Sequence, residues 1–534
     1  MNMSFDLISI STAAIFFSLF LCLGSAMYQN HWPFTFLLLL SLFSSIFSLA
    51  LKVWLIPGGF AWRKYHFFRT QKNISGPIGW PVLGILPQLG PLAHQKLAVM
   101  ASSFGAKRLM AYSLGSTRVI ISSHPETAKE ILSGNSFSDR PIKESARLLM
   151  FERAIGFSPS GDYWRNLRKI AANNMFSPRK IACLEGLRQA VASEMIEGVS
   201  KAMNLKNVVE VRGILQKGAL RNMIESVFGS STCLGLEGEE LGFMVKEGYE
   251  LIAEFNWADY FPLGFMDFNG VKRRCHALGI KVSAIVGEMI HKRRVDGEFS
   301  KGNDFLSVLL SLPKEDQLSD ADMIAVLWEM VFRGTDTVAI LLEWTLARMV
   351  MHPHIQEKAR QEINTCTGSH RHVRDTDIPN LPYLQSIVKE VLRLHPPGPL
   401  LSWARLAIHD VHVGKFFVPA GTTAMVNMWA ITHDPAIWKD PWVFKPERYV
   451  EEEVSIMGSD LRLAPFGSGR RVCPGKVLGL TTVHLWLARL LQEFKWLPVQ
   501  PVDLSECLKL SLEMKKALSC HAVSIREGQA FSSA

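Results

Sequence analysis

The chain has 534 residues, of which 48% are hydrophobic and 20% are charged. This apolar content supplies a large folded core and excludes an intrinsically disordered chain. The formal net charge is +9, but the basic residues are dispersed and no nucleic-acid-binding motif accompanies them, so we expect no nucleic-acid partner. Anionic lipid or an acidic protein suits this charge better. The eight cysteines include no CxxC pair, which favours a reducing compartment and argues against structural zinc.

The N-terminal region is strongly apolar. Residues 7–27 and 34–51 contain no charged side chain, and each run is long enough to span a bilayer as a helix. A cleaved signal peptide is the weaker interpretation, because no basic segment precedes the first run. We therefore expect residues 1–56 to form a membrane anchor with one or two spans.

A basic segment follows this anchor. Residues 57–75 contain no acidic residue and four basic ones, which are Arg63, Lys64, Arg69 and Lys72. The positive-inside rule places such a segment in the cytosol. Pro77 and Pro81 restrict the backbone that follows. We interpret residues 57–81 as a basic, proline-rich hinge and expect residues 82–534 to form a globule that faces the cytosol.

Helical patterns dominate the globule, and a few short strands accompany them. Apolar β-forming residues on both sides of Gly115 predict a hairpin within residues 109–121. The longest predicted helix covers residues 319–351, with Ser319 as its N-cap and Pro353 after its end. A second helix is predicted for residues 382–395, and a β pair around residues 419–421. The pattern predicts a mainly α fold with a small β portion.

One cysteine stands in a loop that holds several glycines. Residues 466–475 read FGSGRRVCPG, and the glycines in this segment favour an irregular backbone that a planar cofactor can approach closely. Exposed amides there can donate hydrogen bonds to a thiolate, and Arg471 can pair with a carboxylate. The alternative is that Cys473 is a small hydrophobic residue in a tight turn.

This segment resembles the haem-binding signature of the cytochrome P450 family. Phe466, Gly469, Arg471, Cys473 and Gly475 stand at its fixed positions. The resemblance implies a cytochrome P450 fold with an N-terminal transmembrane anchor, and a haem-thiolate catalytic domain within residues 82–534. It also implies heme b as the cofactor, with Phe466 beside it and Cys473 as the axial ligand of its iron.

Four further segments resemble the family's motifs. RGTDT at residues 333–337 is similar to its oxygen-activating segment, which gives Asp336 and Thr337 catalytic roles in proton delivery. Glu390, Arg393 and Arg448 resemble its structural charge network, with an exposed ion pair as the alternative. The resemblance implies that the haem propionates are bound by Trp164, Arg168, Arg405 and Arg471. Solvent-facing cations are the alternative for Arg168 and Arg405.

Arg333 departs from the family pattern, in which a small residue precedes the glycine. An arginine beside the distal pocket can bind an anionic substrate group through paired donors. The alternative, which we favour slightly, is a salt bridge to Glu329 four residues earlier on the helix.

The segments at residues 328–339 and 398–405 resemble the KLUH and PLASTOCHRON type of plant A-type microsomal cytochrome P450. This resemblance implies an endoplasmic reticulum membrane protein that receives electrons from NADPH through NADPH-cytochrome P450 reductase. It further implies a monooxygenase that hydroxylates a small lipophilic, fatty-acid-like molecule and promotes plant organ, leaf or seed growth. Two alternatives remain, a haem-thiolate isomerase or dehydratase that needs no reductase, and a non-catalytic haem-binding regulator.

Overall fold

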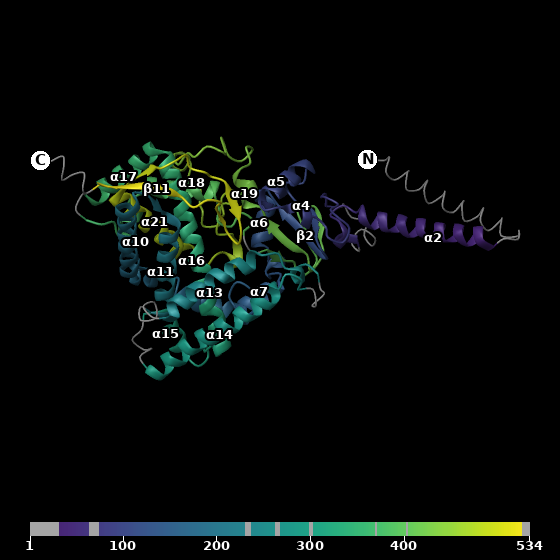
Figure 1. The fold of residues 1–534 in the computed structure, drawn as a ribbon, viewed down its shortest axis with the longest axis horizontal. Coiled ribbons are helices and arrows are strands. Elements are labelled where there is room, and N and C mark those ends of the chain that lie inside the picture. Colours follow the sequence, from purple (N-terminus) through teal and green to yellow (C-terminus); the bar gives the residue numbers. More distant parts are fainter. Residues whose placement is uncertain are drawn as a thin grey trace.

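The computed structural model describes residues 31–63, 74–229, 236–261, 267–297, 303–368, 371–401 and 404–525. The first apolar run, residues 7–27, lies outside them, as do Lys64, Arg69 and Lys72 of the basic segment. Helix α2 (His31–Trp54) contains the second run and projects from the globular body (Figure 1). No helix in the described ranges combines the length and the hydropathy that crossing a membrane requires.

The globular body is mainly helical with a small β portion, as predicted (Figure 1). Its helices are α4 (Leu86–Leu89), α5 (Ala93–Ser103), α6 (Pro125–Ser133), α7 (Glu144–Met150), α8 (Asp162–Asn174), α9 (Pro178–Cys183), α10 (Glu185–Lys206), α11 (Val211–Phe228), α13 (Leu236–Ala253), α14 (Val271–Asp296), α15 (Phe305–Leu310), α16 (Asp320–Met351), α17 (Pro353–Thr367), α18 (Pro382–Leu394), α19 (Met428–Thr432), α20 (Arg448–Glu451) and α21 (Lys476–Glu493).

The strands form small separate sheets. The largest has the order β1-β2-β7-β4 and is built from β1 (Met110–Leu114), β2 (Thr117–Ser122), β7 (Thr423–Val426) and β4 (Arg405–Leu406). A second sheet joins β3 (Val209–Glu210), β11 (Ser519–Ser524) and β8 (Phe494–Pro498). The remaining pairs are β5 (Val411–Val413) with β6 (Phe416–Val418), and β9 (Glu506–Leu508) with β10 (Leu512–Met514).

Two β predictions have different outcomes. The β1–β2 hairpin is confirmed, and it turns at Gly115, whose φ of 57° suits glycine. Strands also flank residues 419–421, but the prediction that they pair with each other is wrong. Strand β6 pairs with β5, whereas β7 pairs with β2 in parallel and with β4. A local turn signal marks where strands begin and end, but distant residues decide their partners.

Helix α16 is the central element of the body. It begins after Ser319, whose hydroxyl accepts a hydrogen bond from the Asp322 amide, and it ends before Pro353, as predicted. Buried residues within 323–332 pack into one hydrophobic cluster with side chains of α13 and α14. Buried residues within 339–350 pack into another with α18 and α21. The segment from residue 333 to 337 therefore lies where the two clusters meet.

Candidate functional site

The loop that carries Cys473 has a conformation that depends on glycine. Gly467 and Gly469 have φ values of 72° and 68°. A side chain on Gly469 would place its Cβ 2.3 Å from the carbonyl oxygen of Leu132, so no larger residue fits. The Cys473 amide donates to the Phe466 carbonyl at 3.0 Å and closes the loop. Cys473 is thereby held at one wall of a cavity that Phe466 also lines.

The sulfur of Cys473 lies just before helix α21. The Gly475 amide donates a hydrogen bond to this sulfur, and Gly475 is the N-cap of α21. Burial raises the pKa of the Cys473 thiol, while Arg333, the Gly475 amide and Arg168 act in the opposite direction. A buried thiolate needs a cation to stabilise it, and a bound metal ion meets that need directly.

Besides Arg333 of α16, four arginines from distant parts of the chain line the same cavity, and they are Arg140, Arg168, Arg405 and Arg471. Burial lowers the pKa of each of them, to about 9 for Arg405 and about 10 for Arg471. Buried cations without matching anions are costly. The cluster therefore fits a ligand that carries more than one negative charge.

The four guanidinium groups are held to different extents. Arg471 donates to the carbonyl oxygens of Ser138 at 2.8 Å and Ser158 at 2.7 Å, and Arg405 donates to the Ser468 carbonyl at 3.0 Å. Arg168, in contrast, donates no hydrogen bond within the described part of the chain. Its unsatisfied donors make it the arginine most available to a bound anion.

Trp164 lies between two of these arginines. Its ring is 4.1 Å from the Arg471 guanidinium carbon and 5.9 Å from that of Arg168, which are cation–π distances. Its indole N–H donates to the Ile155 carbonyl at 3.0 Å. Trp164 therefore acts on the cavity through its ring, which orders the neighbouring arginines.

Arg140 was missed by the sequence analysis. It follows helix α6 and donates to the Ala404 carbonyl at 3.3 Å, next to Arg405. It is separated from the haem-binding signature by more than 300 residues of chain. Its position in an irregular segment gave no periodic signal, so only the folded chain reveals its approach to the cavity.

The two predicted catalytic residues on α16 face different surroundings. Thr337 lines the cavity together with Cys473. Asp336, one residue earlier, is hydrogen-bonded to Gln216 of α11. Burial raises the pKa of Asp336 to about 6, and the nearby Glu513 adds to the rise. This carboxyl group therefore changes its protonation close to neutral pH, which suits proton transfer.

Arg333 lines the cavity and is paired with Glu329 one turn earlier on α16. The Arg333 Nη1 atom is 3.1 Å from Glu329 Oε1, which confirms the predicted local salt bridge. Glu329 Oε1 also accepts from the Gly156 amide at 2.8 Å. A Cβ on Gly156 would lie 2.4 Å from both side chains, so this glycine makes room for the pair. The side chain of Arg333 remains about one-third exposed, at 34%.

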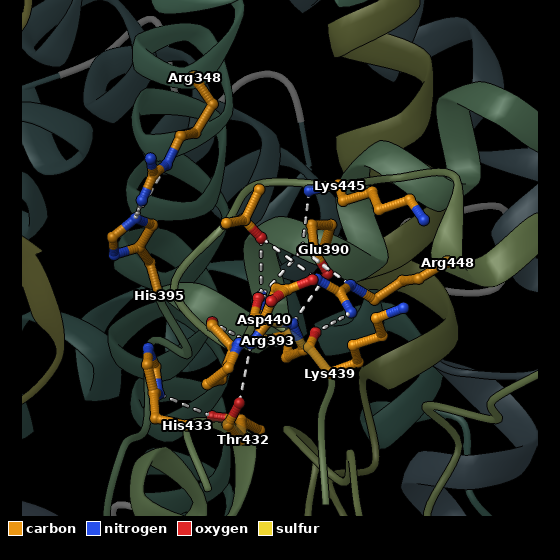
Figure 2. A network of polar contacts seen from close by, with 12 residues as sticks. Arg348, Glu390, Arg393, His395, Thr432, His433, Lys439, Asp440, Lys445 and Arg448 are labelled. Carbon is orange, nitrogen blue, oxygen red and sulfur yellow. Dashed lines mark hydrogen bonds and ion pairs between the residues drawn. The ribbon is translucent and has the colours of Figure 1, made fainter. Parts of the chain in front are cut away.

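Glu390, Arg393 and Arg448 form one network away from the cavity (Figure 2). Arg393 binds Glu390 through two parallel contacts of 2.9 Å, and Arg448 Nε adds a third at 3.1 Å. Arg393 also donates to the carbonyl oxygens of Thr432 and Pro441. The alternative of an exposed ion pair is wrong, because the Glu390 and Arg393 side chains are both 0% exposed.

The comparisons with known proteins agree with this geometry. A model of the cytochrome P450 family matches residues 74–520. The chain belongs to this family. Cytochrome P450 78A5 of Arabidopsis thaliana is 54% identical over 480 residues, which are 88% of this chain and 92% of that protein. Cytochrome P450 78A3 of Glycine max is 51% identical and covers 87% of this chain and 91% of its own length.

A solved structure shows the same fold. A zebrafish cytochrome P450 with progesterone superposes with a TM-score of 0.69 at 24% sequence identity, over 80% of this chain and 99% of that chain. The family is that of haem-thiolate monooxygenases, so this chain is a haem enzyme whose iron is bound by a cysteine thiolate. The described residues fit this cofactor, because a half-buried cysteine and a cluster of buried and half-buried arginines line a single cavity.

Glu390→Gln tests the charge network. The substitution keeps the shape of the side chain but leaves Arg393 buried without its counter-charge, so we expect the free energy of unfolding to fall by about 3–5 kcal/mol. Denaturant titration of the haem-loaded protein measures this loss. Glu451→Gln is the matched control, because Glu451 is 65% exposed and pairs with Lys445; its cost should stay below about 1 kcal/mol. Equal losses in the two variants would contradict a stabilising role for the network.

Proposed function

We propose that this cytochrome P450 is a microsomal monooxygenase that receives electrons from NADPH through NADPH-cytochrome P450 reductase and hydroxylates a small lipophilic, fatty-acid-like molecule. The single observation that carries this proposal is that Cys473, in the loop before α21, and Thr337, on α16, line one cavity. The relatives named cytochrome P450 78A are plant proteins. By the resemblance to the KLUH and PLASTOCHRON type, the biological role is promotion of organ, leaf or seed growth.

The residues around the cavity have separate roles in this proposal. When bound, thiolate-ligated heme b supplies the electron density that favours O–O cleavage. Arg140, Arg168, Arg405 and Arg471 neutralise the propionates, and Trp164 orders two of these arginines. Phe466 packs beside the cofactor, and Cys473 supplies the thiolate. Glu390, Arg393 and Arg448 fix the fold around the site.

Proton delivery is assigned to the middle of α16. The Thr337 hydroxyl donates and accepts hydrogen bonds at the cavity surface, where the protons are consumed. The Asp336 carboxyl group, one residue earlier, lies close to the buried Glu513 and to Lys509, whose side chain is 55% exposed. This arrangement supports an oxygenase over an isomerase or dehydratase, since only the oxygenase consumes protons. A regulator without catalytic activity would not need proton-transfer groups such as Asp336 and Thr337 beside the cavity.

The N-terminal region is proposed to anchor the enzyme in the endoplasmic reticulum. Residues 1–56 form the anchor, residues 57–81 the hinge, and residues 82–534 the catalytic domain on the cytosolic side. Support comes from α2, where Leu39, Phe43 and Phe47 are 58–68% exposed. Large apolar side chains exposed along one helix are suited to contact with membrane lipid.

Reconstitution with reductase separates the three functions. Wild-type protein should consume NADPH and dioxygen, and its reduced form with carbon monoxide should show the long-wavelength Soret band of thiolate ligation. Cys473→Ala should lose this band, whereas the control Cys366→Ala should keep it. Arg168→Ala should retain less haem.

Two outcomes would favour the alternative functions. Turnover of a peroxide without NADPH would indicate an isomerase, and full biological activity of Thr337→Ala would indicate a regulator.

Arg333 is proposed to contact an anionic group of the substrate while it is paired with Glu329. The two roles are compatible, because a guanidinium has five N–H donors. Arg333→Gln should weaken binding of fatty acids by about 1.5–3 kcal/mol, the usual contribution of a hydrogen bond to a charged group, and leave their methyl esters unaffected. Spectral titration measures both affinities. Arg153→Gln, which removes another arginine paired with α16, is the control. Equal losses for acid and ester would refute the substrate contact.

Digestion of intact microsomes by an added protease tests the proposed topology. The positive-inside rule places the basic segment, and with it the catalytic domain, on the cytosolic side. We therefore expect the domain to be degraded without detergent. Residues 73–75, Asn-Ile-Ser, form an N-glycosylation sequon. Protection of the domain until detergent is added, or a glycan at Asn73, would reverse this orientation.

A further inference from the structure

A tyrosine of helix α13 is bonded to the backbone of helix α16. The Tyr249 hydroxyl donates a hydrogen bond to the carbonyl oxygen of Phe332. The two rings are stacked, with centroids 4.5 Å apart and planes inclined by 11°. Tyr249 also lines the cavity that Cys473 and Thr337 line. One side chain therefore contacts both the cavity and the main chain of the central helix.

The bonded carbonyl has a specific place in α16. In an α-helix, each carbonyl accepts the N–H of the residue four positions later, so the Phe332 carbonyl is the regular partner of the Asp336 N–H. The Asp336 amide is in turn within hydrogen-bonding reach of the Tyr249 hydroxyl. The hydroxyl thus lies beside one helical hydrogen bond, the one from the Asp336 amide to the Phe332 carbonyl. A side chain inserted into the helical ladder loosens it locally.

The packing of α13 explains how the hydroxyl reaches this point. Gly248 precedes Tyr249, and a Cβ at this glycine would lie 2.7 Å from Cε2 of the Phe332 ring and 3.3 Å from Cδ2 of Leu149. A larger residue would push α13 away from α16. Burial raises the pKa of Tyr249 further above its usual value, so the hydroxyl keeps its proton and remains a donor.

We propose that Tyr249 is a positioning residue that competes for the Phe332 carbonyl, weakens its hydrogen bond from the Asp336 amide within the continuous helix α16, and so links the placement of Asp336 and Thr337 to helix α13. A molecule that fills the cavity contacts Tyr249, and any shift of α13 changes the bond to the Phe332 carbonyl. Substrate occupancy is thereby connected to proton delivery. This inference rests on the proton-delivery roles proposed above for Asp336 and Thr337.

Amide hydrogen exchange of the haem-loaded protein tests the weakening of this helical hydrogen bond directly. Tyr249→Phe keeps the stacked ring but removes the hydroxyl, so the Asp336 N–H should bond the Phe332 carbonyl without a competitor. Its exchange should slow by roughly threefold to tenfold, the factor expected for one backbone hydrogen bond. Tyr163→Phe is the matched control, because the Tyr163 hydroxyl lies within hydrogen-bonding distance of the Arg153 carbonyl and of Asp322 near the start of α16, and has one proton to donate to either. Unchanged or faster exchange at Asp336 in Tyr249→Phe would overturn the proposal.

The products of dioxygen reduction test the link to proton delivery without a known substrate. With reductase, one NADPH and one proton reduce dioxygen to hydrogen peroxide, whereas two NADPH and two protons reduce it to two waters. The ratio of NADPH, dioxygen and peroxide gives the peroxide share. We expect this share to rise in Tyr249→Phe and to stay at the wild-type value in Tyr163→Phe.

In the same assay, Thr337→Ala distinguishes the proposed role of Thr337 in proton delivery from the proposed link through Tyr249. A raised peroxide share in Thr337→Ala with an unchanged share in Tyr249→Phe would overturn the link through Tyr249 and leave the role of Thr337 intact. An unchanged share in Thr337→Ala would refute the proposed role of Thr337. Exchange at the Asp336 amide would then still decide whether Tyr249 weakens the helical hydrogen bond to the Phe332 carbonyl.

Discussion

The burial of several guanidinium groups around one cavity is the constraint on which the architecture of the site depends. Charged groups lose their hydration when they are buried, and they are stable there only with anions or polar partners. Backbone carbonyls satisfy part of Arg405 and Arg471, and Trp164 covers two guanidinium groups with its ring. In the proposed holoenzyme, the propionates of the cofactor would supply the missing negative charge. Protein and haem therefore complete each other electrostatically.

Helix α16 has two roles in the structure. It is packed in the hydrophobic core, and it also contributes polar side chains to the lining of the cavity. Most of its side chains are buried in the two hydrophobic clusters that it joins. Between these clusters it carries three polar residues, Arg333, Asp336 and Thr337. Arg333 is paired with Glu329, and Asp336 is hydrogen-bonded to Gln216. Thr337 faces the cavity. The three residues to which we assign the chemistry thus lie within about one turn of a helix that is packed into a hydrophobic cluster on either side of them.

The charge network around Glu390 connects segments of the chain that lie far apart in the sequence. It joins α18 to the irregular chain between residues 432 and 448, where few regular backbone hydrogen bonds are available (Figure 2). A buried carboxylate that accepts from two arginines and one backbone amide is satisfied on both oxygens. Such a network ties loops together in one arrangement, since any other would leave a charge unpaired.

Local sequence determined a large part of this protein. The ends of α16 followed from the Ser319 cap and from Pro353, and the hairpin followed from the turn at Gly115, because these signals act within a few residues. The haem-binding signature was likewise readable, since its glycines and Cys473 are contiguous. Glu390 and Arg393 stand three positions apart, so their shared helix face was predictable as well.

Only the tertiary structure decided which distant segments meet. It paired β7 with β2 and β4, placed Arg140 beside Arg405, turned Asp336 toward Gln216, and brought the Tyr249 hydroxyl to the Phe332 carbonyl. None of these contacts has a fixed spacing in the sequence. Each results from the packing of whole helices and sheets, in which a single missing methyl group, as at Gly248, sets how closely two elements approach.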